Sequence, residues 1–269
     1  MAKVVGIDLG GTYIRAGVVE GKNVLDYIKE ETPKTKTEIL KKIIKIISLV
    51  LKKDVRGIGV AYPGILKNGF VEKTPNLPIQ NFNLKKFLEE NFQRKIVVEN
   101  DAKCVALSEI KYGTKKKNFI VITLGTGVGG GIVINKKLYK GDGNAGEVGH
   151  IIIDDGRDLE FFWKKNIAEM KKNFGKEFLI RDLIKSKDKK AKKILGEIYR
   201  TLGMGIGSLV SAFDPEEIIL MGGVREGGRK FIDGVSREIK KYTIIKKIPK
   251  MRWSKIKHPG VLGAGLLLE

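Results

Sequence analysis

The sequence predicts an α/β protein with two related lobes, and three observations support this. Apolar, strand-like segments alternate with segments of helical period along most of the chain. An apolar strand, a glycine-rich turn with a threonine and a second apolar strand follow one another at residues 4–20 and again at 119–134. The chain has 269 residues, which is more than one hydrophobic core usually serves. We therefore expect an internal duplication with a core in each half.

The first half is expected to form most of one lobe. Residues 37–52 carry Ile39, Ile43 and Ile47 at the spacing of one helix face. The strand at 57–61 ends at Pro63-Gly64, a dipeptide that favours a turn. Further strands are predicted at residues 4–9, 12–20, 23–30 and 96–99, and further helices at 84–92 and 102–112.

The pattern begins again after the charged stretch at residues 114–118. Residues 119–124 are predicted to form a buried strand, 125–131 a glycine turn and 132–134 the returning strand. That strand leads into a hairpin at Asn135-Lys136, residue types that tolerate a tight turn.

The remainder is predicted to be helical with one strand near its end. A helix-rich region at 158–213 precedes a strand within 216–224, which feeds a glycine pair. A C-terminal helix at about 260–269 contains small residues that allow close packing, and we assign it to the first lobe. The expected lobes are therefore residues 1–113 with the C-terminal helix, and residues 114–259.

The charge balance limits the choice of partners. There are 52 Lys and Arg against 31 Asp and Glu, a formal net charge of +21 that could indicate a nucleic-acid partner. The lysines are scattered, however, and no aromatic residues are interleaved with the clusters at 115–117 and 185–193 to stack on bases. We expect no nucleic-acid partner, and a basic surface that attracts a polyanionic substrate such as a nucleotide.

Hydropathy and cysteine content indicate the cellular compartment of the protein. No apolar run reaches the roughly 20 residues of a membrane-spanning helix. The first strand runs straight into Asp8 and a glycine turn, which is unlike a signal peptide. We therefore expect a cytoplasmic protein with no membrane partner. Cys104 is the single cysteine, so it excludes an internal disulfide and is expected to be inert core.

Two glycine-rich turns suggest a polyphosphate site. Glycines let backbone N–H groups converge on an anion, and a hydroxyl adds a donor. One such turn is weak evidence, because tight hairpins use glycine for purely conformational reasons. "DLGGT" (8–12) stands in the first repeat and "LGTGVGGG" (124–131) in the second, which favours two loops that bind one polyphosphate from opposite sides.

Asp8 could cap its turn, but beside two phosphate loops we favour it as a Mg²⁺ ligand acting through water.

Two pairs of polar residues could serve an alcohol substrate. Asn100 and Asp101 follow a strand, at the end where α/β proteins build their sites. Either could cap the next helix, Asp101 being the stronger candidate because it directly precedes the helix predicted at 102–112. A carboxylate here could also accept the hydroxyl proton during phosphoryl transfer. In "AGEVGH", Glu147 and His150 lie on a glycine-bounded loop and could clamp neighbouring sugar hydroxyls.

Together these motifs resemble the ROK family, named for repressors, open reading frames and kinases, within the actin-like and hexokinase-like ATPase superfamily. The resemblance is carried, in the family's order, by "GIDLGGTYIRAGVV", "GIGVAYPGIL", "VENDAKCVALSE", "ITLGTGVGGGIVINKKLYKG", "NAGEVGHI" and "DPEEIILMGGV". It implies a two-lobed, RNase H-like fold, each lobe a mixed sheet flanked by helices, with the active site in the cleft between the lobes. It also favours a homodimer.

The resemblance implies a role for each matching residue. Asp101 matches the catalytic base. The implied phosphate contacts are Gly10, Gly11, Thr12, Gly125, Thr126, Gly127 and Gly129, with Gly222 and Gly223 beside the adenosine. The implied sugar contacts are Gly64, Asn76, Asn100, Asp101, Glu147 and His150.

One segment departs from the family pattern. The family usually follows "GEVGH" with three cysteines that bind zinc together with the histidine, whereas "IIIDDGRDLEFFW" has none. We expect no zinc, and a His150 free of metal. Leu159-Glu160 falls where the family has a leucine-glutamate pair, so Glu160 is carried over as a sugar contact. Lys164-Lys165 stand where Ser-Gly is usual.

The implied activity is that of an ATP-dependent, glucokinase-type hexose kinase that uses Mg²⁺. Asp101 would deprotonate a primary hydroxyl such as the 6-OH of glucose. An N-acetylmannosamine or N-acetylglucosamine kinase and a fructokinase stay open, because pocket shape decides among these sugars. A sugar-sensing regulator without catalysis is the remote alternative, and a strand that begins at Val4 leaves no room for a DNA-binding helix-turn-helix before it.

Overall fold

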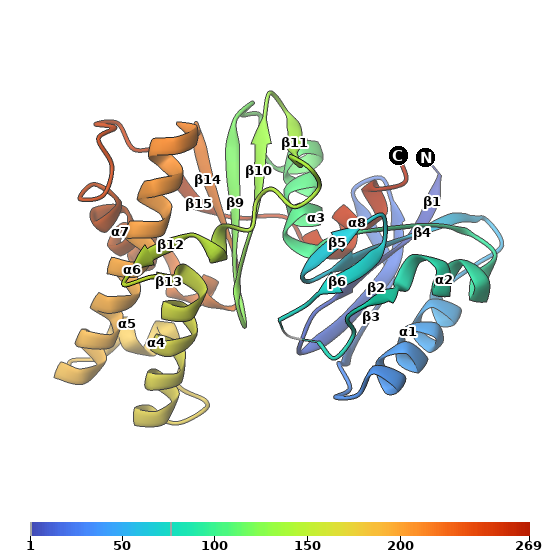
Figure 1. The fold of residues 1–269 in the computed structure, drawn as a ribbon, viewed down its shortest axis with the longest axis horizontal. Helices are drawn as coiled ribbons and strands as arrows, with labels where there is room; N and C mark the ends of the chain where they lie inside the picture. Colours follow the sequence, from blue (N-terminus) through green and yellow to red (C-terminus); the bar gives the residue numbers. More distant parts are fainter. Residues whose placement is uncertain (1, 76) are drawn as a thin grey trace. The chain divides into compact units, whose positions relative to one another are not determined.

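A computed structural model describes residues 2–75 and 77–269. The prediction of an α/β fold is confirmed: the chain forms two five-stranded mixed sheets flanked by helices (Figure 1). The chain divides into two compact units. The first unit is Met1–Lys115, Lys137–Ala145 and Lys255–Glu269, and the second is Lys116–Lys136 and Gly146–Ser254. The sequence prediction puts Lys137–Ala145 in the C-terminal lobe, whereas this segment belongs to the first compact unit. The division into functional lobes stays a prediction.

The first sheet has the strand order β3-β2-β1-β4-β8. Strand β1 pairs antiparallel with β2 and parallel with β4, and β4 pairs parallel with β8. The carboxyl ends of β1, β4 and β8 therefore share one edge of the sheet. The bounds are β1 Lys3–Leu9, β2 Tyr13–Glu20, β3 Asn23–Glu31, β4 Val55–Tyr62 and β8 Lys95–Asn100.

Helices cover both faces of this sheet. Because side chains alternate along a strand, Val5, Ile7 and Leu9 of β1 share one core with the buried isoleucines of α1, while Val4 packs with Val261 of α8 on the other face. Helix α1 begins after Thr35, whose side chain accepts a hydrogen bond from the N–H of Glu38. The helices of the first unit are α1 Lys36–Val50, α2 Leu84–Phe92, α3 Asp101–Ser108 and α8 Pro259–Leu266.

Helix α8 lies against the backbone of its neighbours. A Cβ on Gly59 of β4 would stand 1.8 Å from the carbonyl oxygen of Ala264, and a Cβ on Gly6 of β1 would stand 2.1 Å from that of Val261. In α8 itself, a Cβ on Gly263 would stand 1.7 Å from the carbonyl oxygen of Cys104. These three positions have room for glycine only, so glycines on both sides of the contact allow α8 to pack closely against β1, β4 and α3.

The second sheet repeats the arrangement of the first, with the order β11-β10-β9-β14-β15. Strand β9 pairs antiparallel with β10 and parallel with β14, which pairs parallel with β15. The duplication inferred from the sequence is thus visible in strand pairing. The bounds are β9 Phe119–Leu124, β10 Val128–Ile134, β11 Lys137–Tyr139, β14 Glu217–Gly222 and β15 Lys250–Trp253.

The glycine turn predicted at residues 125–131 is shorter in the structure, and that prediction is wrong in extent. Strand β10 begins at Val128, so Gly129 and the two glycines after it are strand residues. A Cβ on Gly130 would meet the side chain of Val148 at 2.6 Å, so glycine here admits a neighbouring segment instead of bending the chain. The hairpin at Asn135-Lys136 is confirmed, with positive φ angles of 53° and 61°.

Helices and short pairings complete the second unit. The predicted helix-rich region contains α4 Leu159–Phe174, α5 Ile180–Lys185 and α6 Lys189–Phe213, and α7 Gly228–Ile239 follows. Their core includes Trp163 and Phe231, at 2% and 0% exposed. The smaller elements are β5 Ile65–Lys67, β6 Phe70–Lys73 and β7 Phe82–Asn83 in the first unit, and β12 Ile152–Asp154 and β13 Arg157–Asp158 in the second. No helix in residues 2–75 or 77–269 is long and apolar enough to cross a membrane.

We expect Gly59→Ala to destabilise the protein by at least about 2 kcal/mol, because the added methyl group must displace the α8 backbone. Gly196→Ala is the matched control, since this glycine lies within α6 with open space around it and alanine favours a helix by about 0.5–1 kcal/mol. Scanning calorimetry of both variants checks the pair. An unchanged transition in Gly59→Ala would show that α8 is not tightly docked.

Candidate functional site

The candidate residues of the first unit gather at the carboxyl ends of its parallel strands. Asp8 is level with Ala61 in the β1–β4 pairing, and Tyr62 is level with Asn100 in the β4–β8 pairing. The segments that follow these three strands therefore leave the sheet at one edge, the usual place for a site in an α/β fold. The predicted residues there are Asp8, Gly10, Gly11, Thr12, Gly64, Asn100 and Asp101. Asn76 lies outside the described residues.

The first glycine turn is held from its flanks. The N–H of Gly10 donates to the carbonyl of Tyr13 at 3.0 Å, which closes the turn between β1 and β2. The hydroxyl of Thr32 donates to the carbonyl of Gly10 at 2.6 Å, and the N–H of Thr32 donates to the carbonyl of Thr12 at 3.0 Å. Gly11 and Thr12 are exposed. The turn is thus anchored while its tip stays accessible to a ligand.

Asp8 is a largely buried carboxylate beside this turn. Its side chain is 15% exposed, and Oδ2 lies 3.2 Å from Nη1 of Arg15, its cross-strand partner on β2. A Cβ on Gly260 would stand 2.7 Å from the carboxyl carbon, so a side chain there would push into Asp8. Burial raises the pKa of Asp8, and the Arg15 guanidinium only partly opposes that rise.

Asn100 and Asp101 connect β8 to α3. The helix cap is Asn100, whose Oδ1 accepts from the N–H of Lys103 at 3.1 Å, whereas Asp101 is the first residue of the helix. The Nδ2 of Asn100 donates to the carbonyl of Gly64 at 3.4 Å. Gly64 has a φ of +119°, and a Cβ there would stand 2.3 Å from the carbonyl oxygen of Lys73, so only glycine fits. Asp101 is partly buried, and its Oδ1 accepts from the N–H of Ala102 at 2.8 Å.

The second glycine loop follows β9 in the second unit and spans Gly125, Thr126 and Gly127. The N–H of Gly125 donates to the carbonyl of Gly127 at 3.0 Å, which makes the loop tight. Nothing lies within 4 Å of where a Cβ on Gly125 would be, so this side of the loop is open. The indole N–H of Trp163, a buried residue of α4, donates to the carbonyl of Gly125 at 3.0 Å.

Glu160 is the second anchor of this loop. Its side chain is 9% exposed, and Oε2 accepts from the N–H of Val128 at 2.8 Å. Oε1 lies 2.6 Å from Nζ of Lys164, one helical turn further along α4. A Cβ on Gly127 would stand 2.1 Å from Oε2, so the carboxylate fills the space that glycine leaves. The structure therefore puts this carboxylate against the loop backbone, and its role as a sugar contact stays a prediction.

Glu147 and His150 flank a short 3₁₀ turn at Val148–His150. His150 is half exposed, and its Nδ1 lies 2.8 Å from Oδ2 of Asp158. The other oxygen of Asp158 accepts from the N–H of Phe161 at 2.7 Å, so Asp158 caps α4 and orients the imidazole at once. A Cβ on Gly149 would stand 2.1 Å from the carbonyl oxygen of Val128, which ties this turn to β10.

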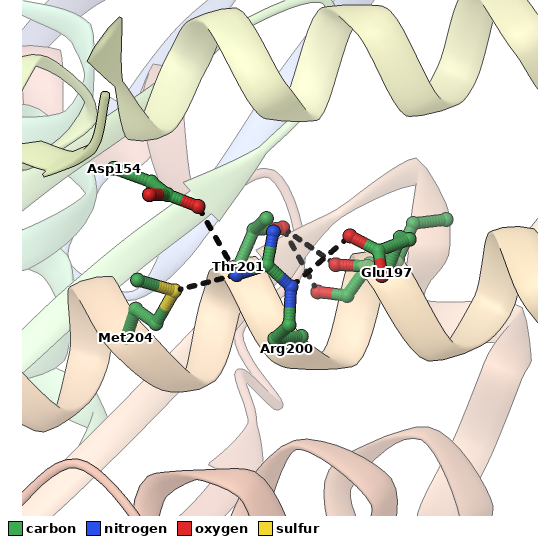
Figure 2. A network of polar contacts seen from close by, with 6 residues as sticks. Asp154, Glu197, Arg200, Thr201 and Met204 are labelled. Atoms are coloured by element: carbon green, nitrogen blue, oxygen red, sulfur yellow. Dashed lines mark hydrogen bonds and ion pairs between the residues drawn. The ribbon is translucent and has the colours of Figure 1, made fainter. Parts of the chain in front are cut away.

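Strands β12 and β13 occupy the segment where the family usually has its zinc loop. Nη1 of Arg200, on α6, lies 3.2 Å from Oδ2 of Asp154 on β12, and its Nε lies 3.1 Å from Glu197 (Figure 2). Asp154 of β12 is thereby paired with α6, while Asp158 of β13 caps α4 and contacts His150. No group of three or more His, Cys, Asp or Glu that could hold a metal occurs in residues 2–75 or 77–269.

Gly222 and Gly223 end β14 beside the start of the second loop. Gly222 is level with Leu124 in the β9–β14 pairing and has a φ of +127°. A Cβ there would stand 1.9 Å from the carbonyl oxygen of Leu124, so glycine is required. Gly223 has open space where a Cβ would be.

The family-implied Mg²⁺ can be tested against these residues. Mg²⁺ is usually held by one or two carboxylates, with waters and substrate phosphates completing its coordination. Asp8 supplies one carboxylate next to the first glycine turn, which fits such a site. Local sequence patterns do not single out Asp158, Trp163 or Arg200. Trp163 and Arg200 contact residues 38 and 46 positions away, and Asp158 stands out only through its contact with His150.

Comparisons with known proteins agree on one family. The sequence profile of the ROK family matches residues 4–269. A glucokinase of Halalkalibacterium halodurans is 30% identical over 285 residues, which cover 89% of this chain and 86% of that protein. A xylose repressor of Bacillus spizizenii is 28% identical over 261 residues, which cover 87% of this chain and 68% of that protein.

A solved structure extends the likeness to the whole fold. The crystal structure of a ROK family glucokinase from Streptomyces griseus in complex with glucose and AMPPNP matches with a TM-score of 0.84. It is 27% identical, and the match covers 98% of each chain. The predicted family resemblance is thereby confirmed in sequence and in fold.

We expect Asp8→Asn to raise the melting temperature at pH 7. Because the folded-state pKa of Asp8 lies above its ordinary value of 3.8, this group stabilises the fold below that value and loses its contribution as the pH rises through the folded-state pKa. The difference in melting temperature between variant and wild type should therefore grow from pH 4 to pH 7.

The exposed Asp54→Asn is the control with the opposite sign. Lys3 lowers the pKa of Asp54, so its charge stabilises the fold above the ordinary pKa and its removal should slightly lower the melting temperature at pH 7. Thermal melts across this pH range test both variants. A lower melting temperature for Asp8→Asn at pH 7 would mean that the Arg15 ion pair outweighs burial.

Proposed function

The chain belongs to the ROK family, and on that premise we propose that it is an ATP-dependent sugar kinase that phosphorylates a hexose hydroxyl, foremost the 6-OH of glucose. The observation that carries this proposal is Asp101, at the carboxyl end of β8 on the sheet edge that also bears the first glycine turn. A relative with the same fold was crystallised with glucose and AMPPNP, which supports both substrates.

In the proposed reaction Asp101 accepts the proton of the sugar hydroxyl as that oxygen attacks the γ-phosphorus of ATP. The bond from the γ-phosphorus to the β,γ-bridging oxygen breaks, and the products are a sugar phosphate and ADP. The proton on Asp101 passes to solvent. A positioned base of this kind contributes about 10²–10⁴-fold to rate.

The glycine turns would bind the phosphates. The turn at Gly10–Thr12 and the loop at Gly125–Gly127 offer backbone N–H groups and two threonine hydroxyls as donors to phosphate oxygens. Mg²⁺ held by Asp8 through water would supply neutralisation of phosphate charge. Gly223 has open space beside the second loop, which suits the implied adenosine contact.

Asn100, Glu147 and His150 would orient the sugar. Asn100 is fixed by its bonds to Lys103 and Gly64, and Glu147 and His150 bracket a tight turn. Because Nδ1 of His150 faces the Asp158 carboxylate, Nε2 is the atom that accepts a bond from a sugar hydroxyl.

A regulatory function is the second candidate, because a xylose repressor is among the relatives. The Asp101 carboxylate at the sheet edge, where a base would be needed, supports catalysis over sensing alone. A gel shift with genomic DNA at physiological salt tests the alternative, and a discrete sequence-specific complex would support it.

We expect Asp101→Asn to lower kcat at least about 100-fold, because the hydroxyl proton then has no acceptor. Glucose affinity should change less than about threefold, since the amide keeps the shape of the carboxylate. Coupled ADP release measures turnover and calorimetry measures binding. Asp26→Asn, an exposed change on β3, is the control and should leave both values unchanged. Normal turnover in Asp101→Asn would reject the assigned base.

A substrate panel tests the identity of the sugar. We expect the highest kcat/KM for glucose among glucose, fructose, allose, N-acetylglucosamine and N-acetylmannosamine, with ATP as donor. A 2-acetamido group adds bulk that the pocket must accommodate, so preference for an N-acetylhexosamine would reassign the enzyme to amino sugars. No ADP release with any sugar would overturn the kinase proposal.

A further inference from the structure

An acidic side chain lies against the loop to which the proposed function assigns a phosphate. The carboxylate of Glu160 accepts from the N–H of Val128 at 2.8 Å and lies so near Gly127 that a Cβ there would be 2.1 Å from Oε2. At 9% exposure it is poorly screened by water. A carboxylate in this place would repel a phosphate on the same loop unless its charge were balanced.

Lys164 provides that balance from the same helix. Its Nζ lies 2.6 Å from Oε1 of Glu160, and the ammonium side chain is 41% exposed. An ammonium group has three N–H donors, and this contact uses one of them. The lysine therefore pairs with the buried acid while much of its side chain is open to solvent.

This pair differs from the other lysine–glutamate pairs of the same spacing in the described chain. Lys85–Glu89 and Lys86–Glu90 on α2 have separations of 3.8 and 3.9 Å, and all four side chains are 42–71% exposed. Such surface pairs contribute little to stability. In the Glu160–Lys164 pair, Nζ and Oε1 are only 2.6 Å apart and the carboxylate is buried against the backbone at Gly127 and Val128. This pair is therefore part of the environment of the second glycine loop.

We propose that Lys164 is a residue of the phosphoryl-donor subsite, neutralising Glu160 and donating a hydrogen bond to a nucleotide phosphate on the loop Gly125–Gly127. The proposal rests on the proposed kinase function, because that function puts a phosphate on this loop. The ligand class is a nucleoside triphosphate. Lys164 acts in binding, and Asp101 stays the base.

The test is binding of AMPPNP with Mg²⁺ to the full chain, measured by calorimetry without sugar. We expect Lys164→Gln to weaken binding at least about tenfold, the effect of losing a hydrogen bond to a charged group. Lys164→Arg keeps the charge and the donors and should stay within about threefold of wild type. Lys165→Gln removes the same charge one residue further along, at an exposed position, and should have no effect.

A double variant separates neutralisation of Glu160 from hydrogen bonding to the phosphate. Glu160→Gln with Lys164→Gln leaves no unbalanced acid, so it also guards against misfolding of the single variant. We expect its AMPPNP affinity to stay below that of wild type because the phosphate has lost a donor. Full recovery would overturn the direct phosphate contact.

Steady-state kinetics supply a readout that a purely structural role would not move. Lys164→Gln should raise the KM for ATP at least about tenfold and leave the KM for the sugar within about threefold. Equal AMPPNP affinity in wild type and Lys164→Gln would overturn this inference and leave the kinase proposal standing. Failure of the wild type to bind AMPPNP would instead count against the kinase proposal.

Discussion

Parallel hydrogen bonding between neighbouring strands fixes where the candidate residues of each unit lie. Strands β1, β4 and β8 run in one direction, so Asp8, Gly64 and Asp101 meet at one edge although more than 90 residues separate the first from the last. Strands β9 and β14 do the same for Gly125 and Gly222. Helix caps and ion pairs then orient the side chains of residues whose positions this strand pairing determines.

Local patterning predicted the elements whose own residues carry the signal. The apolar run of β1, the isoleucine spacing of α1 and the turn at Asn135-Lys136 each reflect a period or a φ preference within a few residues. The strands β12 and β13 were missed because they have three and two residues, too few for alternation to show. The extent of the glycine turn at 125–131 was predicted wrongly because glycine is common both in turns and in closely packed strands. Only the contact of Gly130 with Val148 shows that this glycine belongs to a strand.

Sequence patterns and family motifs named candidate site residues, but they did not predict the contacts that these residues make. Family motifs identified Asp8, Asn100 and Glu160, but their partners lie elsewhere in the sequence. Glu160 accepts a hydrogen bond from Val128, which lies 32 positions earlier in the sequence, and no sequence spacing predicts that bond. The helix cap is Asn100 and not the stronger candidate Asp101, since both Asn and Asp cap well and the backbone conformation decides between them. Roles for these residues rest on the experiments proposed above.

Helix α8 carries a consequence for biosynthesis. It packs on β1 and β4 through glycine, yet in the chain it follows the whole second unit. The ribosome therefore completes the second unit before it synthesises α8, which covers one face of the first sheet. Until then Val4 and Val19 lack their partners Val261 and Leu262, which leaves additional apolar surface of the nascent first unit open to aggregation.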